Sequence, residues 1–125
     1  MTKASALYNF FSYFGLDAYE ENSVPAGEEA PEFPYLTYSL VTDAFDNEVL
    51  LTVSLWYRGY SFLAINNKTE EISRAIGRRG KVLDCDGGKI WLKRGTPFAQ
   101  SMGDESDNSI KRKLINITAE FLTAD

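Results

Sequence analysis

The chain has 125 residues, of which 44% are hydrophobic and 14% aromatic, and its formal net charge is −5. This length fits a single domain over residues 1–125, and the apolar content is sufficient for a packed core, which argues against global disorder. The negative charge disfavours a protein that binds nucleic acid tightly through its phosphates.

The first third of the chain predicts a helix followed by an acidic loop. Four apolar residues recur at the spacing of one helical face: Leu7, Phe10, Phe11 and Phe14. We therefore expect a helix from about Lys3 to Phe14 that ends at Gly15. Residues 15–34 hold six acidic residues, three prolines and no Lys or Arg, which favours an extended loop with a short strand near Ala18.

Two strands are predicted next, because apolar and polar residues alternate over Tyr35–Thr42 and again from Val49 to Tyr57. A turn around Asp46 would pair them as an antiparallel hairpin. Leu50 and Trp56 lie on the face of the second strand opposite its other apolar residues, so we expect that this face is also covered.

A second helix is predicted between Phe62 and Ile76, where apolar residues recur at alternating spacings of three and four. Ser61 is suited to cap its start and Gly77 to end it. Arg78 and Arg79 follow at the point where positive charge complements a helix C-terminus.

The last third predicts a hairpin, a long loop and a final strand. Strands over Val82–Cys85 and Lys89–Lys93 flank Asp86-Gly87-Gly88, which is typical of a tight turn. Residues 94–108 show little periodicity and are predicted to form a long loop, and alternation returns in a strand from about Ser109 to Leu122. The order of elements predicts an α+β two-layer sandwich, with a mainly antiparallel sheet of about five strands and two helices on one face.

The composition offers few groups for catalysis or metal binding. There is no histidine, which removes the commonest general base, and the lone Cys85 is expected to be a packed thiol. Asp84 and Asp86, with Asp43 and Asp46, could pair as carboxylates or hold a hard cation, although Asp is also favoured in turns. We expect no enzyme, no cofactor and no metal site.

Cysteine usage and hydropathy predict the compartment. One cysteine cannot form an internal disulfide, and the first residues lack the apolar run of a signal peptide. No apolar stretch approaches the roughly 18 residues that a membrane span requires. We expect a protein that folds in a reducing cytoplasm and does not contact a membrane.

Two segments are candidates for contact with a partner. Phe98 and Met102 are apolar residues within the predicted loop 94–108, and they either pack under their own loop or anchor an arm in a partner. The second segment is the basic run Lys111-Arg112-Lys113, which alternates across a strand. It either keeps an edge strand solvated or forms salt bridges with a neighbouring subunit.

Several segments taken together resemble the tail terminator, or tail completion, proteins of long-tailed bacteriophages: Pro34–Tyr38, Asn47–Arg58, the helix to Gly77, the Gly-Gly hairpin and Ile115–Phe121. The resemblance implies a structural role without catalysis. Such proteins form rings, usually hexamers, on the finished tail tube, stop its polymerisation and present a surface to the head connector. The implied partners are other copies of the chain, the major tail tube protein and the head connector. The implied location is the virion tail, assembled in the cytoplasm of a bacterial host.

Within this interpretation, residues can be assigned to two roles. The expected assembly interface comprises Phe98, Met102, Arg78, Arg79, Lys111, Arg112 and Lys113. Acids expected to face a central channel are Glu28, Glu29, Glu32, Asp104 and Glu105. Inward-facing acids would repel phosphates, so that DNA passes without specific binding.

Two alternatives stay open. A related virion protein, such as another head–tail connector or a tail tube component, would share these features but have different partners. From another class, a small-molecule-binding α+β domain or minor enzyme would show a deep pocket with convergent polar groups.

Overall fold

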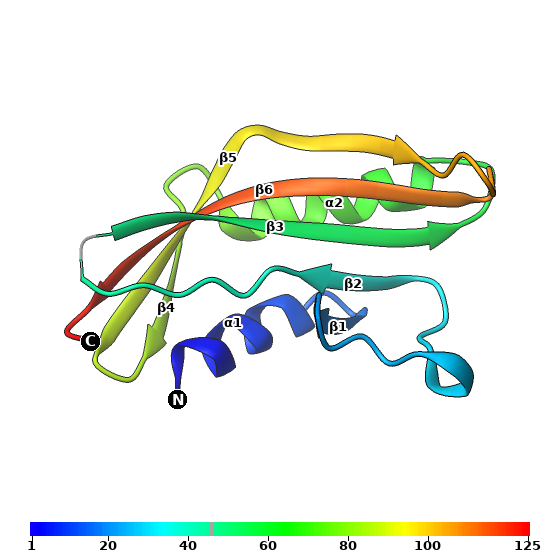
Figure 1. Cartoon of the computed structure of the whole chain (residues 1–125). Helices are drawn as coiled ribbons and strands as arrows, with labels where there is room; N and C mark the ends of the chain where they lie inside the picture. Colours follow the sequence, from blue (N-terminus) through cyan, green and yellow to red (C-terminus); the bar gives the residue numbers. More distant parts are fainter. Residues whose placement is uncertain (46) are drawn as a thin grey trace.

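The computed structural model describes residues 1–45 and 47–125 (Figure 1). Its elements follow in the order α1 (Lys3–Ser12), β1 (Asp17–Glu20), the 3-10 turn η1 (Gly27–Glu29), β2 (Tyr35–Tyr38), β3 (Asn47–Arg58), α2 (Leu63–Ile76), β4 (Lys81–Cys85), β5 (Gly88–Gly103) and β6 (Ile110–Thr123).

The described residues form one six-stranded sheet in the order β1-β2-β3-β6-β5-β4. The pairing of β1 with β2 is parallel, and the other neighbouring strands pair antiparallel. The long strands β3, β5 and β6 form the centre of the sheet, which curls around the helices (Figure 1). The α+β architecture predicted from the sequence is confirmed, with one strand more than expected.

The core lies between the helices and one face of the sheet. Leu51 and Val53 of β3 pair with Ile117 and Ile115 of β6, and their side chains are fully buried. The same core cluster contains residues from α1 and α2: Ala6, Leu7, Phe10, Phe11, Ile65, Ile72 and Ile76. Both helices therefore pack on this inner face, as the alternation and the helical spacing predicted.

Local signals account for the limits of the helices. Thr2 Oγ1 accepts a hydrogen bond from Ser5 N at 3.1 Å at the start of α1, and Gly15 has a φ of 79° after its end. Ser61 Oγ accepts from Leu63 N at 3.1 Å at the start of α2. Gly77, with a φ of 75°, directly follows that helix. Gly77 ends α2 as predicted, whereas α1 ends at Ser12, before the predicted Phe14, and the N-cap position of α2 is Phe62, one residue after the predicted Ser61.

The predicted loop 94–108 is wrong for most of its length. Strand β5 continues to Gly103, with a register shift between Arg94 and Ala99, and Ala99–Gly103 pair with Ile115–Lys111 of β6. Residues 95–98, which contributed to the prediction of a loop, form a bulge in this strand. A Cβ at Gly95 would lie 2.8 Å from Asn116 O, and Pro97, which lacks an N–H, lies where the ladder is interrupted.

The predicted hairpin between Tyr35–Thr42 and Val49–Tyr57 is paired over a shorter length than expected. Strand β2 ends at Tyr38, whose partner is Val53, and Asn47–Thr52 pair with β6 instead. One residue further on, Ser39 N donates to Thr52 O and Thr52 N donates to Ser39 Oγ, each at 2.9 Å. The predicted turn at Asp46 lies outside the described residues.

Strand β6 occupies the centre of the sheet, between β3 and β5. The expectation that Lys111, Arg112 and Lys113 belong to an edge strand is therefore wrong. The strand order explains the error, because the last strand of the chain inserts between two earlier ones, and this long-range pairing leaves no trace in the local sequence.

Candidate functional site

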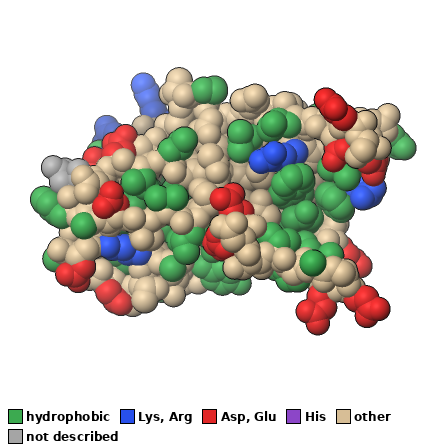
Figure 2. Space-filling view, in the orientation of Figure 1, with side chains coloured by type: hydrophobic (Ala, Val, Ile, Leu, Met, Phe, Trp, Pro, Cys, Tyr) green, Lys and Arg blue, Asp and Glu red, His purple; other side chains and the backbone are tan. Residues whose placement is uncertain are grey.

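The outer face of the sheet, opposite α1 and α2, is covered by no helix of the described chain. Figure 1 shows α2 behind β3 and β6, so the same view in Figure 2 looks onto this face. Hydrophobic side chains gather there over the end of β3 and the start of β6 (Figure 2). Leu50, near the other end of β3, is 57% exposed. This face of the sheet therefore presents apolar side chains that no helix of the described chain covers.

A row of four paired residues crosses this face. Tyr35 of β2 lies opposite Trp56 of β3, Trp56 opposite Arg112 of β6, and Arg112 opposite Met102 of β5. The Tyr35 and Trp56 rings stack with centroids 6.1 Å apart and planes 15° apart. The Arg112 guanidinium carbon lies 4.9 Å from the centroid of the Trp56 ring. Cross-strand aromatic and cation–π pairs of this kind stabilise a sheet surface.

Polar atoms fix the orientation of this row. Trp56 Nε1 donates to Thr37 Oγ1 at 2.9 Å, and Arg112 Nε donates to Ser54 Oγ at 3.0 Å. Burial raises the pKa of the Tyr35 hydroxyl. The side chains are therefore ordered before any partner arrives, which lowers the entropy lost on binding.

The row extends at the β2 end. Phe33 packs against Tyr35 with ring centroids 5.4 Å apart, and Tyr19 of β1 meets Tyr35 at 6.3 Å. The Arg58 guanidinium carbon lies 4.8 Å from the Phe33 ring centroid. We call Tyr19, Phe33, Tyr35, Trp56, Arg58 and Arg112 the aromatic cluster. Alternation in the sequence predicts that Trp56 lies on this face, but the sequence does not predict the cluster, because the cluster's members come from four separate segments.

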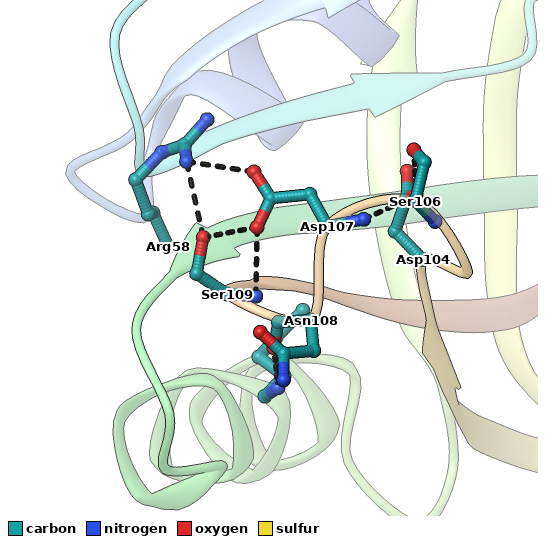
Figure 3. Close-up of polar contacts among 7 residues, drawn as sticks. Arg58, Asp104, Ser106, Asp107, Asn108 and Ser109 are labelled. Atoms are coloured by element: carbon teal, nitrogen blue, oxygen red, sulfur yellow. Dashed lines mark hydrogen bonds and ion pairs between the residues drawn. The ribbon is translucent and has the colours of Figure 1, made fainter.

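Arg58 also connects the aromatic cluster to the turn between β5 and β6 (Figure 3). Its Nη1 donates to Asp107 Oδ2 at 3.0 Å and to Ser109 Oγ at 3.1 Å. Asp107 Oδ1 accepts from Ser109 N and Oγ at 2.9 and 2.6 Å. The Ser109 hydroxyl, followed by Arg58, holds the pKa of Asp107 below its usual range.

Asp104, shown in Figure 3, and Glu105 were predicted to face a channel; both lie in the same turn and are exposed. Asp104 Oδ1 accepts hydrogen bonds from Ser106 Oγ at 2.7 Å and from Ser106 N at 2.8 Å. Bonds from Ser106 and from the Asp107 backbone lower the pKa of Asp104. Asp104 thus shapes the turn, as Asp does in many tight turns. The other predicted channel acids, Glu28, Glu29 and Glu32, are exposed in and after η1.

Phe98 and Met102 do not form the two anchors of one arm. Phe98 lies in the bulge, half-buried against the core, whereas Met102 lies on the outer face opposite Arg112. The structure therefore supports packing of Phe98 under its own segment, which was one of the two predicted alternatives. Met102 is half-buried on the outer face of the sheet.

The basic residues lie at separate places. Lys111 Nζ lies 5.4 Å from the Phe62 ring centroid and donates to Asn108 O, and Lys113 Nζ donates to Ser101 Oγ at 2.8 Å. Arg112 points to the outer face with Trp56.

Arg78 and Arg79 are far from this run, exposed in the turn that joins α2 to β4. The predicted interface residues are thus divided among four places: the outer face, the bulge of β5, the core side of β6 and this turn.

The structure describes three of the four candidate carboxylates for metal or acid–base chemistry, Asp43, Asp84 and Asp86, and each has its own polar partner; Asp43 Oδ1 accepts from Ala44 N at 2.7 Å. Asp84 pairs with Lys89, which lowers the Asp84 pKa, and Asp86 pairs with the terminal ammonium of Met1. Asp46 lies outside the described residues. Among the residues that are described, no group of three or more His, Cys, Asp or Glu could hold a metal ion. Cys85 is half-buried at the end of β4.

No protein-family model matches the chain, and neither does any curated protein sequence. In the described chain, neither α1 nor α2 is long and apolar enough to cross a membrane.

Proposed function

We propose that this chain is a structural protein of a long-tailed bacteriophage that forms a ring, with six copies, at the end of the tail tube. The ring ends polymerisation of the tube and joins the tail to the head connector. Its partners are other copies of the chain, the tail tube protein and the connector, and it acts in the virion tail after assembly in the host cytoplasm. This role requires no catalytic group.

The observation that carries this proposal is the outer face of the sheet. One face of an antiparallel sheet can face water, but then it is normally polar. Here it carries the ordered row Tyr35, Trp56, Arg112 and Met102, with Leu50 57% exposed on the same face. Aromatic residues, Met and Arg are the residue types enriched in protein interfaces. A surface of this composition supports a role in contact with other proteins.

Exposed acids are consistent with a ring through which DNA passes. Asp104 and Glu105 lie at the tip between β5 and β6, and Glu28, Glu29 and Glu32 lie in and after η1. Carboxylates that line a channel repel phosphates and leave the DNA free to slide. The proposal places acids of these groups at the channel wall.

The experiment that tests the proposal is electron microscopy of tail tubes assembled with and without the purified protein. We expect a ring at one end of each tube and a narrow distribution of tube lengths when the protein is present. Self-propagating tubes of the protein itself would indicate a tube component instead. Tubes of unchanged length without density at their ends would contradict the proposal.

Substitutions on the outer face sharpen this test. Leu50→Asp combined with Met102→Asp places two carboxylates on the outer face, at the exposed Leu50 and the half-buried Met102, so we expect loss of tube capping with the fold retained. The matched control is Tyr60→Asp, because Tyr60 is 82% exposed but follows the end of β3 rather than lying on the outer face. Equal capping by both variants would exclude the outer face from the contact.

A further inference from the structure

A groove lies between α1 and β4. It has a volume of 550 Å³ and is mostly apolar, with Ala6, Phe10, Tyr13, Ala75, Val82 and Leu83 among its lining residues. Tyr13 is 80% exposed and Val82 48% exposed. Because β4 is the last strand of the described sheet, this groove lies at one margin of the domain. A concave apolar surface of this kind is suited to hold a segment of another protein.

Positive charge borders the groove. Ala75 and Lys81 both line it, and the turn that joins them carries the exposed Arg78 and Arg79. The stretch from Arg74 to Val82 contains four basic residues and no acidic one. Asp84 also lines the groove, but its carboxylate is paired with Lys89.

A segment of opposite charge projects from another part of the domain. We call Glu21–Glu32 the acidic segment; it contains four Glu and no basic residue. Glu28, Glu29 and Glu32 are exposed, as are Ala26 and Ala30. In Figure 1 it lies beyond the start of β2, at the end of the molecule away from β4, and acidic side chains project there in Figure 2.

We propose that the acidic segment of one copy docks in the α1–β4 groove of the next copy. Glu28, Glu29 and Glu32 would pair with Arg78, Arg79 and Lys81 of the neighbour, and Ala26 and Ala30 would meet the apolar lining. Such a contact joins two different surfaces, so repeated copies close into a ring when the rotation permits. This inference rests on the proposed function, and it assigns these three Glu to subunit contact instead of the channel wall.

Charge complementarity makes a specific test available. Variant A carries Glu28→Lys, Glu29→Lys and Glu32→Lys, and variant B carries Arg78→Glu, Arg79→Glu and Lys81→Glu. Each variant alone brings like charges together, so we expect its dissociation constant for assembly to rise at least about tenfold. In an equal mixture, each reversed surface meets a complementary one on the other variant. The mixture should therefore form rings in which A and B alternate.

Light scattering coupled to size exclusion measures the mass of each sample. The control variant is Glu105→Lys, which reverses an exposed charge at another tip of the domain and should assemble as the unmodified chain does. Circular dichroism checks that each variant is folded, as expected for substitutions of exposed residues.

The possible outcomes separate this inference from the proposed function. Loss of assembly in A and in B, with recovery in the mixture, supports the docking contact. Assembly of A or B alone, or no recovery in the mixture, overturns it while the ring itself stands. A monomeric unmodified chain overturns the proposed function, and the docking contact with it.

Discussion

Residues 94–108 and residues 15–34 both contain glycine and proline and lack a clear period, yet their structures differ. The first segment is mostly strand, because β5 continues through a bulge and pairs with β6 as far as Gly103. The second contains β1 and then follows an irregular path to β2, apart from η1, and the acids between these two strands are exposed. The two segments differ in their neighbours. Residues 94–103 lie beside the long strand β6, so β5 can resume its pairing with β6 after the bulge. A break in local periodicity therefore predicts a loop only where no such partner is close.

The largest expected effect comes from filling the bulge at Gly95. A Cβ at this position would lie 2.8 Å from Asn116 O and 2.9 Å from Asn116 Cβ, so Gly95→Val should destabilise the fold by about 3 kcal/mol. Gly103→Val is the matched control, because nothing lies within 4 Å of a Cβ there. Urea denaturation measures both, and equal stability of the two variants would contradict the bulge.

The next effect separates the two apolar residues of the segment. Phe98 packs against the core, so Phe98→Ser should cost about 2 kcal/mol, less than the loss for a fully buried Phe. Met102 lies on the outer face, and Met102→Ser should cost about 0.5 kcal/mol. Thermal denaturation of the two variants gives the comparison. A larger loss for Met102 would place it, and not Phe98, against the core.

A smaller and pH-dependent effect is expected at the turn between β5 and β6. The pKa of Asp107 is lowered in the fold, so its stabilising contribution is complete above the unfolded value of about 3.9 and is lost as the pH falls through the lower folded value. Asp107→Asn should therefore be less stable than the unmodified chain at pH 7, and the difference should shrink below about pH 4. A difference that is constant from pH 7 to pH 2 would show that the carboxylate charge is not involved.

The smallest effect on folding is expected in residues 15–34. Glu28→Gln, Glu29→Gln and Glu32→Gln change exposed side chains, so the unfolding midpoint of the monomer should stay within error of the unmodified chain. Amide hydrogen exchange should show fast exchange over 26–30 and protection over 99–103, where β5 pairs with β6. Equal exchange in both segments would remove the distinction between them.

Much of the fold follows from local pattern. The apolar spacing of Leu7 to Phe14 and of Ile65 to Ile76 predicts both helices with their buried faces, and Gly87 marks the β4–β5 turn with a φ of 82°. These elements were predictable because neighbours in sequence decide them. The central position of β6 was not, since it depends on pairing with strands distant in the chain.

Of the aromatic cluster in the candidate site, the sequence predicted only the position of Trp56 on the outer face. Alternation places Trp56 on the outer face, but its neighbours Tyr35 and Arg112 come from separate strands whose register depends on the whole sheet. Arg58 was not singled out, although it joins Phe33 to Asp107. The sequence feature that could have pointed to this site is Trp56-Tyr57-Arg58 at the end of a strand. It indicates an interface only when no helix is known to cover the face on which Trp56 and Arg58 lie.

The central claim is that the chain assembles with copies of itself into a closed ring. The most direct measurement is the mass of the purified protein in solution, by light scattering across a concentration series at low and high salt. We expect one discrete species of six copies, which is about 85 kDa from a 14.1 kDa chain, and which dissociates as salt screens the charge pairs. A monomer of 14.1 kDa at every concentration would contradict the account.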